Sequence, residues 1–208
     1  MKIYIDLDGT IIDVFDRYCG ILNEYLAPFG VKIPRSEYVR MRHDGVNEQD
    51  MPKQLFGRDI PFDDYRTFKL SRLESAQWLE KDSIIGDVSR LKEYPSEYAI
   101  ITQRNSRDAA LAQIEKLGLD RYFDEIIVVT PQKGVNSKAE YLKGRVTAGD
   151  CIIGDSRTEL ECAEILGIRG FFVKSGLFGP HTAENHTIFE NYIECIEYIH
   201  SHYKNTEV

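Results

Sequence analysis

The chain has 208 residues, of which 42% are hydrophobic and 29% are charged, as is typical of a soluble globular protein. This length allows one well-buried core together with a small accessory domain. The formal net charge of −8 argues against a primary role in nucleic-acid binding, because phosphate backbones require a cationic surface. A small anionic ligand is compatible with this charge, since a bound cation can set the potential inside one pocket.

The sequence carries no sign of a membrane or secreted protein. No apolar run approaches the length of a membrane span, and the segment after Met1 lacks an apolar signal region. The four cysteines form no CxxC pair and have no zinc-binding spacing with histidine. They are Cys19, Cys151, Cys162 and Cys195. We therefore expect a cytoplasmic protein with free thiols and no membrane partner.

Short apolar runs that favour β-strands recur along the chain. They cover residues 3–5, 98–101, 126–129, 151–153 and 171–173. Because these runs are apolar throughout, they predict a sheet that is buried on both faces and is therefore parallel.

Segments with helical periodicity lie between the later strands, and one more follows the last strand. They cover residues 108–117, 138–143, 159–166 and 187–203. In the first, third and fourth of these segments the spacing of apolar residues places one apolar face on the helix, and residues 138–143 are a shorter helix candidate after Ser137. The alternation of strand and helix predicts a doubly wound, Rossmann-like α/β core.

The stretch between residues 13 and 84 differs, because it has no clear strand and is punctuated by proline and glycine. Its helical patterns cover residues 14–26, 37–42, 49–55 and 63–79. We therefore predict an all-helical domain over residues 13–84, inserted into an α/β core formed by residues 1–12 and 85–208.

Polar residues follow three of the predicted strands. Ligands bind beyond the carboxyl ends of the strands in such sheets, so we expect Asp6, Thr102 and Asp155 to converge. Asp6 and Asp8 lie two residues apart and point to the same side of the chain. One can attack phosphorus while the other protonates the leaving group, and Gly9 lets the backbone turn close to an anion. Two aspartates at a strand end are common, however, and alone they would indicate only the end of a strand.

Three segments together resemble the haloacid dehalogenase-like hydrolases. Residues 3–10, Ile-Tyr-Ile-Asp-Leu-Asp-Gly-Thr, are similar to the first motif of that family. Residues 152–159, Ile-Ile-Gly-Asp-Ser-Arg-Thr-Glu, are similar to its fourth motif, and Thr102 ends an apolar strand as the second motif requires. The motifs occur in the order of the family and at strand ends. The resemblance implies an α/β core with a helical cap inserted after the first motif.

The resemblance also implies a role for each matched residue. Asp6 would be the nucleophile and a Mg²⁺ ligand. Asp8 would be the general acid and base, with its backbone carbonyl on the metal. Asp155 would hold the metal, and Thr102 would donate a hydrogen bond to the phosphoryl group. The divalent cation is needed because a carboxylate does not readily approach a phosphate dianion.

The family uses a lysine to neutralise the phosphoryl group, and two lysines precede the fourth motif. Lys138 follows Ser137 at a predicted helix N-terminus, where the helix dipole can face the same anion. Lys133 lies in a Pro-Gln-Lys-Gly turn, which is more often a solvated loop. We favour Lys138 as the catalytic lysine, with Lys133 as the alternative.

Glu159 departs from the commoner pattern of the family, which has aspartate as the second acid of the fourth motif. Glutamate keeps the charge and adds a methylene, so it would reach the metal through water or directly after adjustment. An acid in the first turn of a helix that interacts with the helix dipole is an equally good interpretation.

Other polar residues give weaker signals. Gly9 and Gln103 join Thr102 as expected substrate-binding residues. Arg104 and Arg107 lie three residues apart near a predicted helix start, which favours a solvated helix face over substrate contact. His43 is expected in a polar loop of the insertion.

The function predicted from these residues is that of a magnesium-dependent phosphatase, which acts on a small phosphorylated metabolite through an aspartyl-phosphate intermediate. A cap that closes over the site favours a small substrate over a protein. Dehalogenases of the family lack the second aspartate of the first motif, and phosphonate hydrolases replace it with a small residue, so Asp8 disfavours both. A phosphosugar mutase and a non-catalytic binding protein on the same fold stay open as alternatives. The oligomeric state is not predicted.

Overall fold

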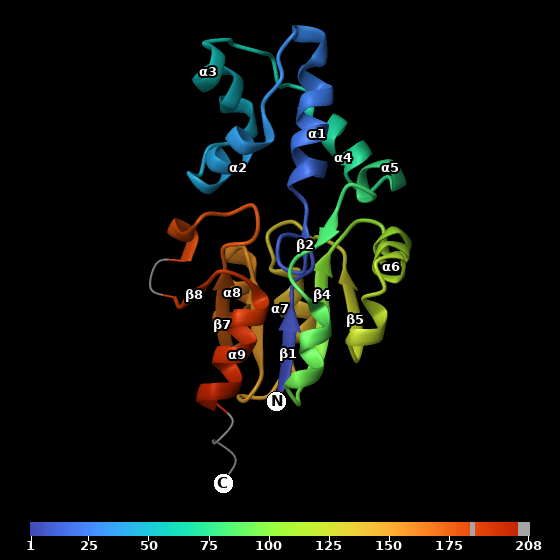
Figure 1. Cartoon of the computed structure of the whole chain (residues 1–208), viewed down its shortest axis with the longest axis vertical. Coiled ribbons are helices and arrows are strands. Elements are labelled where there is room, and N and C mark those ends of the chain that lie inside the picture. Colours follow the sequence, from blue (N-terminus) through green and yellow to red (C-terminus); the bar gives the residue numbers. More distant parts are fainter. Residues whose placement is uncertain (184–185, 204–208) are drawn as a thin grey trace.

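The computed structural model describes residues 1–183 and 186–203 and contains a six-stranded parallel sheet (Figure 1). The strands are β1 (Lys2–Ile5), β4 (Glu97–Gln103), β5 (Glu125–Val129), β6 (Cys151–Gly154), β7 (Arg169–Val173) and β8 (Ile188–Phe189). Their order across the sheet is β5-β4-β1-β6-β7-β8, and every neighbouring pair is parallel. The predicted doubly wound parallel sheet is therefore confirmed.

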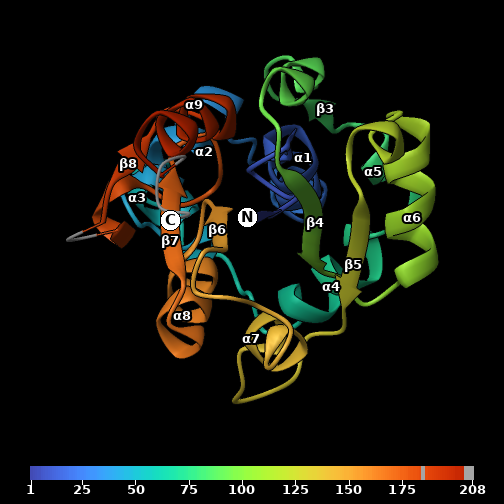
Figure 2. The ribbon, with the colours of Figure 1, turned by 90° about the horizontal axis from the view of Figure 1, so that it is seen from below.

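Helices cover both faces of the sheet. They are α6 (Arg107–Lys116), α7 (Ser137–Leu142), α8 (Arg157–Leu166) and α9 (Tyr192–Tyr203). Seen from below, α7 and α8 lie on one side of the sheet and α9 on the other (Figure 2). Ile3 and Ile5 pack into a core with residues of α6 and α9, whereas Tyr4 between them packs with residues of α7 and α8. Burial on both faces explains why the strands are apolar throughout.

The C-terminal helix is shorter than the periodicity predicts. A helix was expected over residues 187–203, but α9 begins at Tyr192. Ile188–Phe189 forms β8 instead, which pairs with β7. The side chain of Asn191 then accepts hydrogen bonds from the backbone N–H groups of Ile193 and Glu194, at 3.0 and 3.1 Å. Asn191 therefore caps the helix and fixes its start.

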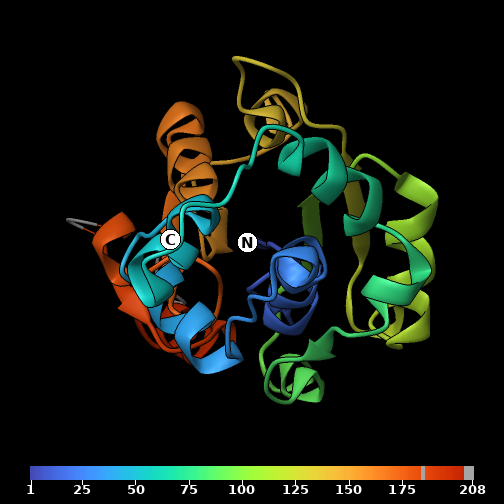
Figure 3. The same ribbon diagram turned by 90° about the horizontal axis from the view of Figure 1, so that it is seen from above.

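Helices α1–α5 lie above the carboxyl ends of the strands (Figures 1 and 3). They are α1 (Phe15–Leu26), α2 (Arg35–His43), α3 (Met51–Phe56), α4 (Tyr65–Leu73) and α5 (Ala76–Leu79). Short 3₁₀ helices connect elements throughout the chain: η1 (Ala27–Phe29), η2 (Glu48–Asp50), η3 (Val88–Glu93), η4 (Asp120–Tyr122) and η5 (Pro180–Ala183). Seen from above, α2 and α3 lie on the side of β7, while α4 and α5 lie on the side of α6.

A two-stranded antiparallel ribbon connects these helices to the sheet. It consists of β2 (Ile12–Asp13) and β3 (Ser83–Ile84), with Ile12 opposite Ile84 and Asp13 opposite Ser83. The expectation that residues 13–84 contain no strand is therefore wrong at both ends of the segment, where strands of two residues are too short to give a pattern. The division of the chain into two domains stays a prediction, and both of its predicted boundaries fall at this ribbon.

The helix predicted over residues 63–79 is broken in two. The break lies between α4 and α5, where Ser75 is extended with ψ of 146°. The side chain of Glu74 accepts hydrogen bonds from the backbone N–H groups of Asn105 and Ser106, at 2.8 and 2.6 Å. This contact with the residues just before α6 stabilises the break between the two helices. No pattern within residues 63–79 predicts the break.

The state of the cysteines and the length of the helices were both predicted from the sequence. All four cysteines are buried and free. Burial raises the pKa of the Cys19 thiol to about 11 and that of Cys151 to about 12, so these thiols are poor nucleophiles. Within residues 1–183 and 186–203, no helix has the length and apolar character needed to cross a bilayer.

Truncation of a central-strand residue tests how far stability depends on the sheet. Ile100 of β4 is fully buried, so Ile100→Ala is expected to lower the free energy of unfolding by about 2–5 kcal/mol. Ile165 of α8 is 62% exposed, and Ile165→Ala is expected to change it by less than about 0.5 kcal/mol. Urea denaturation of both variants measures the difference, and equal effects would contradict the assignment of the core.

Candidate active site

Three polar residues lie where neighbouring strands end. Asp6 directly follows β1, Thr102 is the last residue but one of β4, and Asp155 directly follows β6. All three are buried. Because β4 and β6 pair with β1 on its two sides, these residues share one edge of the sheet, beneath α1–α5 (Figure 1). Parallel α/β sheets bind their ligands at this edge.

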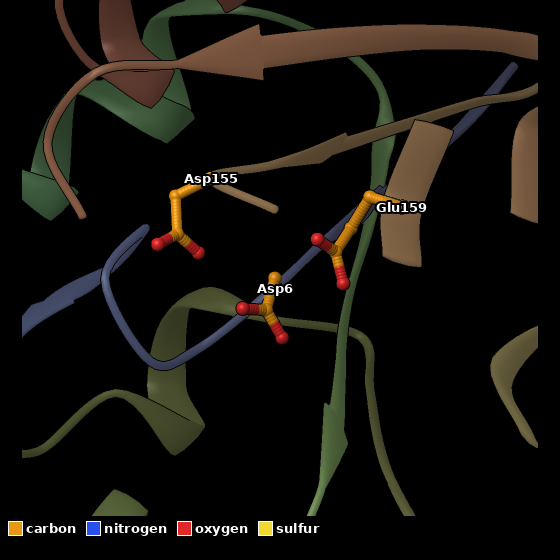
Figure 4. Close-up of side chains that lie close together, drawn as sticks. All are labelled: Asp6, Asp155 and Glu159. Atoms are coloured by element: carbon orange, nitrogen blue, oxygen red, sulfur yellow. The ribbon is translucent and has the colours of Figure 1, made fainter. Parts of the chain in front are cut away.

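Asp6, Asp155 and Glu159 form a compact group of carboxylates (Figure 4). One carboxylate oxygen of each lies within 4.8 Å of the other two. Asp6 comes from the end of β1, Asp155 from the end of β6 and Glu159 from the first turn of α8. Clustered carboxylate oxygens suit a hard divalent cation such as Mg²⁺.

The electrostatics of this group also favour a cation. Burial raises the pKa of Asp6 to about 7, although Lys138 opposes the shift. Burial and the charges of Asp6 and Glu159 raise the pKa of Asp155 well above its ordinary value. Buried carboxyls that resist ionisation in this way lack enough positive charge nearby, and a divalent cation would supply it. The residues present therefore fit a magnesium ion.

Lys138 lies inside the carboxylate group, whereas Lys133 is exposed. The Nζ atom of Lys138 is 2.5 Å from Oδ1 of Asp6 and 2.5 Å from Oε1 of Glu159. Burial alone would lower the pKa of Lys138, but these two carboxylates outweigh it and keep the pKa above its ordinary value. Lys138 is therefore held as a cation beside Asp6, which is the placement expected of the lysine that we favoured.

Glu159 combines features of both interpretations of this position. Its Oε2 accepts hydrogen bonds from Oγ and the backbone N–H of Ser156, at 2.7 and 3.2 Å, and so forms a capping box at the start of α8. Its Oε1 faces Lys138 within the carboxylate group. A Cβ at residue 154 would lie 2.2 Å from Cγ of Glu159, so Gly154 leaves the space that this longer acid occupies.

Gly9 allows the turn after β1 to pass close to the site. Its φ of 79° is in the left-handed region, and a Cβ there would lie 2.5 Å from Oδ2 of Asp155. The backbone carbonyl of Gly9 accepts a hydrogen bond from Oγ of Ser175 at 2.9 Å, which fixes the turn. Only glycine adopts this positive φ without strain and leaves the space beside Asp155 free of a Cβ.

The side chain of Asp8 has partners different from those of Asp6. Its Oδ2 accepts a hydrogen bond from Nε of Arg104 at 2.6 Å, and its Oδ1 accepts one from Nη2 of Arg104 at 2.7 Å. Oδ1 also contacts Nη2 of Arg17. Burial alone would raise the pKa of Asp8, but Arg104 and Arg17 outweigh it and hold the pKa below its ordinary value. Asp8 is therefore an ionised carboxylate in this arrangement.

The expectation that Arg104 lies on a solvated helix face is wrong. Arg104 is 3% exposed, and its backbone N–H donates to the carbonyl of Val129 at 3.0 Å, which prolongs the pairing of β4 with β5. The helix α6 begins only at Arg107, which is exposed. Arg104 therefore continues the strand, and strand alternation places its side chain on the same face as that of Thr102.

Arg17 is a site residue that the sequence analysis missed. It lies on α1 and is 1% exposed. An arginine four residues before Ile21, on a helix with a buried apolar face, was the available signal. Its partner Asp8 is nine residues earlier in the chain, and nothing in the pattern of α1 indicates that contact.

Gln103 points away from Thr102, whereas His43 contacts a loop beside the carboxylate group. Gln103 is the last residue of β4, and strand alternation turns it to the face opposite Thr102. His43 is the last residue of α2, not part of a loop as expected. Nε2 of His43 lies 2.8 Å from the carbonyl oxygen of Gly176. Leu177, which follows Gly176 in the chain, donates its backbone N–H to Oδ2 of Asp155 at 2.8 Å. His43 thus contacts a loop that flanks the carboxylate group.

Residues 3–173 match the sequence profile of the family described as haloacid dehalogenase-like hydrolase. The match covers the strand ends that supply the carboxylate group, together with α1–α5. No curated protein matches the chain by sequence.

Solved structures share the fold over nearly the whole chain. A predicted phosphatase from Clostridium acetobutylicum has a TM-score of 0.68 and 16% identity, over 96% of this chain and 98% of its own. A haloacid dehalogenase-like hydrolase from Streptococcus pneumoniae has a TM-score of 0.69 and 19% identity, over 95% and 97%. A predicted phosphoglycolate phosphatase from Haemophilus somnus has a TM-score of 0.66 and 17% identity, over 94% and 96%. At these identities the likeness shows the fold alone.

Proposed function

The chain belongs to the haloacid dehalogenase-like hydrolases, and we propose that it is a magnesium-dependent phosphatase acting on a small phosphorylated metabolite. The observation that carries the proposal is the carboxylate group at the sheet edge. Asp6, Asp155 and Glu159 lie within 4.8 Å of one another, and Lys138 is hydrogen-bonded to Asp6. This arrangement combines a nucleophilic carboxylate with the positive charge that its approach to phosphate requires.

The metal would be held chiefly by Asp6 and Asp155, with the backbone carbonyl of Asp8 as a further ligand. When bound, Mg²⁺ neutralises the charge between the nucleophile and the phosphate. Both oxygens of Glu159 already have protein partners, Lys138 and Ser156. We therefore propose that Glu159 acts on the metal through water and orients Lys138, because direct coordination would compete with these hydrogen bonds.

The reaction would proceed in two displacements at phosphorus. An oxygen of Asp6 attacks phosphorus and the ester P–O bond breaks. Asp8, which is ionised in this structure, would first take up a proton from solvent and then give it to the leaving oxygen. Water then attacks the phosphorus of the aspartyl phosphate, Asp8 takes its proton, and Asp6 is released with inorganic phosphate. Lys138 holds Oδ1 of Asp6 in place, and Thr102 would donate a hydrogen bond to the phosphoryl group. The ionised state of Asp8 in this structure is the form that activates water.

Phosphate release separates this proposal from the phosphosugar mutase and the non-catalytic binding protein. A phosphatase releases inorganic phosphate from monoesters when Mg²⁺ is present, whereas a mutase moves the phosphoryl group within its substrate. A panel of phosphorylated metabolites, assayed with Mg²⁺ and with a chelator, is the test. Phosphoglycolate belongs in the panel, because a predicted phosphoglycolate phosphatase is among the similar structures. No turnover on any member would favour the non-catalytic alternative.

Substitution of Asp6 tests the nucleophile. Asp6→Asn is expected to abolish phosphate release while the protein stays folded, because an amide is a poor nucleophile and a weak Mg²⁺ ligand. Asp108 on α6 is exposed, so Asp108→Asn serves as the matched control and should retain wild-type turnover. Phosphate release and circular dichroism measure activity and folding. Turnover by a folded Asp6→Asn protein at the wild-type rate would exclude the mechanism.

Substitution of Asp8 tests the general acid. Asp8→Asn is expected to reduce turnover of an alkyl phosphate by about 10²–10⁴-fold, because no group then protonates the leaving oxygen. The loss should be smaller for an aryl phosphate, whose leaving group needs little protonation. Steady-state rates on one substrate of each kind measure the difference. Equal losses on both would assign Asp8 another role.

Magnesium binding is expected to release protons near neutral pH. Asp6 has a pKa of about 7 without metal and that of Asp155 is also raised, whereas a ligand must be ionised to bind. The affinity for Mg²⁺ should therefore fall as the pH is lowered through this range, by about 10-fold per pH unit for each proton released. Titration calorimetry in two buffers of different ionisation enthalpy counts the protons. An affinity independent of pH between about 6 and 8 would contradict the raised pKa values.

A further inference from the structure

Two arginines from distant parts of the chain hold the carboxylate of Asp8. Arg104, which follows β4, bonds both oxygens of Asp8 with two of its nitrogens, at 2.6 and 2.7 Å. Arg17, from α1, contacts the same Oδ1. Arg17 is 1% exposed and Arg104 is 3% exposed. A paired, two-nitrogen contact of this kind fixes the plane of the carboxylate as well as its position.

Each arginine is itself anchored by other buried groups. Nη2 of Arg17 is 3.2 Å from Oδ2 of Asp82, and its Nη1 donates to the carbonyl oxygen of Leu73 at 3.0 Å. Nη2 of Arg104 donates to Oε1 of Gln113 at 3.1 Å. The two guanidinium groups are therefore oriented by residues that do not belong to the carboxylate group around Asp6.

Asp82 and Gln113 link the two anchors. Nε2 of Gln113 donates to Oδ2 of Asp82 at 2.7 Å and to the carbonyl oxygen of Leu79 at 3.2 Å. Both side chains are buried. Asp82 immediately precedes β3, the returning strand of the ribbon, and Gln113 lies on α6. The contacts thus close a buried network that joins α1, the ribbon, α6 and the turn that carries Asp8.

We propose that Arg17 and Arg104 are positioning residues for Asp8, and that Asp82 and Gln113 hold these arginines in place. The inference rests on the proposed function, since it assigns the network to the group that exchanges protons with the leaving oxygen and with water. Arg17 comes from the helical segment and Arg104 from the sheet. The carboxylate of Asp8 is therefore held from both sides only while α1 lies above the carboxyl ends of the strands, as it does in this structure.

Direct contact with the phosphoryl group is the competing role for the arginines. Within the described ranges, Nε of Arg17 and Nη1 of Arg104 are buried and have no hydrogen-bond partner. The other nitrogens of both side chains are occupied by Asp8, Asp82, Leu73 and Gln113. Positioning accounts for the contacts that are made, and kinetics distinguish it from phosphate binding.

Conservative variants provide the kinetic test. Arg104→Lys and Arg17→Lys keep the buried positive charge but lose the planar fork that orients Asp8. We expect each to lower kcat on an alkyl phosphate by about 10-fold or more, with a smaller loss on an aryl phosphate and little change in KM. Arg107 is exposed three residues beyond Arg104, so Arg107→Lys is the matched control and should behave as wild type.

Asp82→Asn tests the network at a distance from the reacting atoms. Asparagine keeps the shape of the side chain and removes the charge that anchors Arg17. We expect kcat to fall more on the alkyl phosphate than on the aryl phosphate, as in the arginine variants. The fall in kcat should be smaller than in Arg17→Lys. A loss that is equal on both substrates, or an increase in KM on both with kcat unchanged, would overturn the positioning role. The second result would assign the arginines to phosphate binding.

A double-mutant cycle separates the failure of this inference from the failure of the proposed function. Asp8→Asn, Arg104→Lys and the double variant are compared by their urea midpoints, which require no turnover. Non-additive shifts are expected, because the two side chains share hydrogen bonds. Additive shifts would overturn the network even in an active enzyme. Non-additive shifts in a protein that releases no phosphate would support the network, reject its catalytic role and contradict the proposed function.

Discussion

Burial of like charges at the edge of the sheet is the constraint on which the site depends. Asp6, Asp155 and Glu159 are brought within 4.8 Å of one another and away from water, where their mutual repulsion is stronger than in solvent. Lys138 offsets part of this repulsion through its bonds to Asp6 and Glu159. One lysine does not balance three carboxylates, so the site retains protons or takes up a cation.

The turn after β1 places two aspartates in opposite electrostatic surroundings. Asp6 faces other carboxylates, and burial raises its pKa to about 7. Asp8, two residues later, faces Arg104 and Arg17, which hold its pKa below the ordinary value. Divergent environments for neighbouring acids are a mark of sites in which the two acids do different chemistry. Around Asp8 the opposite charges are equal in number, since the two arginines Arg17 and Arg104 face the two carboxylates of Asp8 and Asp82.

The residues that could be predicted from the sequence are those whose position follows from a strand end. Asp6, Thr102 and Asp155 each end or follow an apolar run, and the rule for parallel sheets brings them to one edge. Arg104 was misplaced because β4 runs two residues beyond its apolar run, to Gln103, and its pairing with β5 extends to Arg104. Arg17 was missed because its partners lie elsewhere in the chain. The break at Glu74 depends likewise on residues 105–106, which no local pattern can reveal.

The ribbon of β2 and β3 closes the base of the helical segment. Asp13 and Ser83 are paired across two antiparallel strands, so the points where the chain leaves and rejoins the sheet are already neighbours. A tight hairpin turn could join them, and so could a different set of helices, without displacing β1. Such an exchange would keep Asp6, Asp155 and Glu159 at the edge of the sheet but would remove Arg17 together with α1, so a grafted segment would have to supply another cation for Asp8.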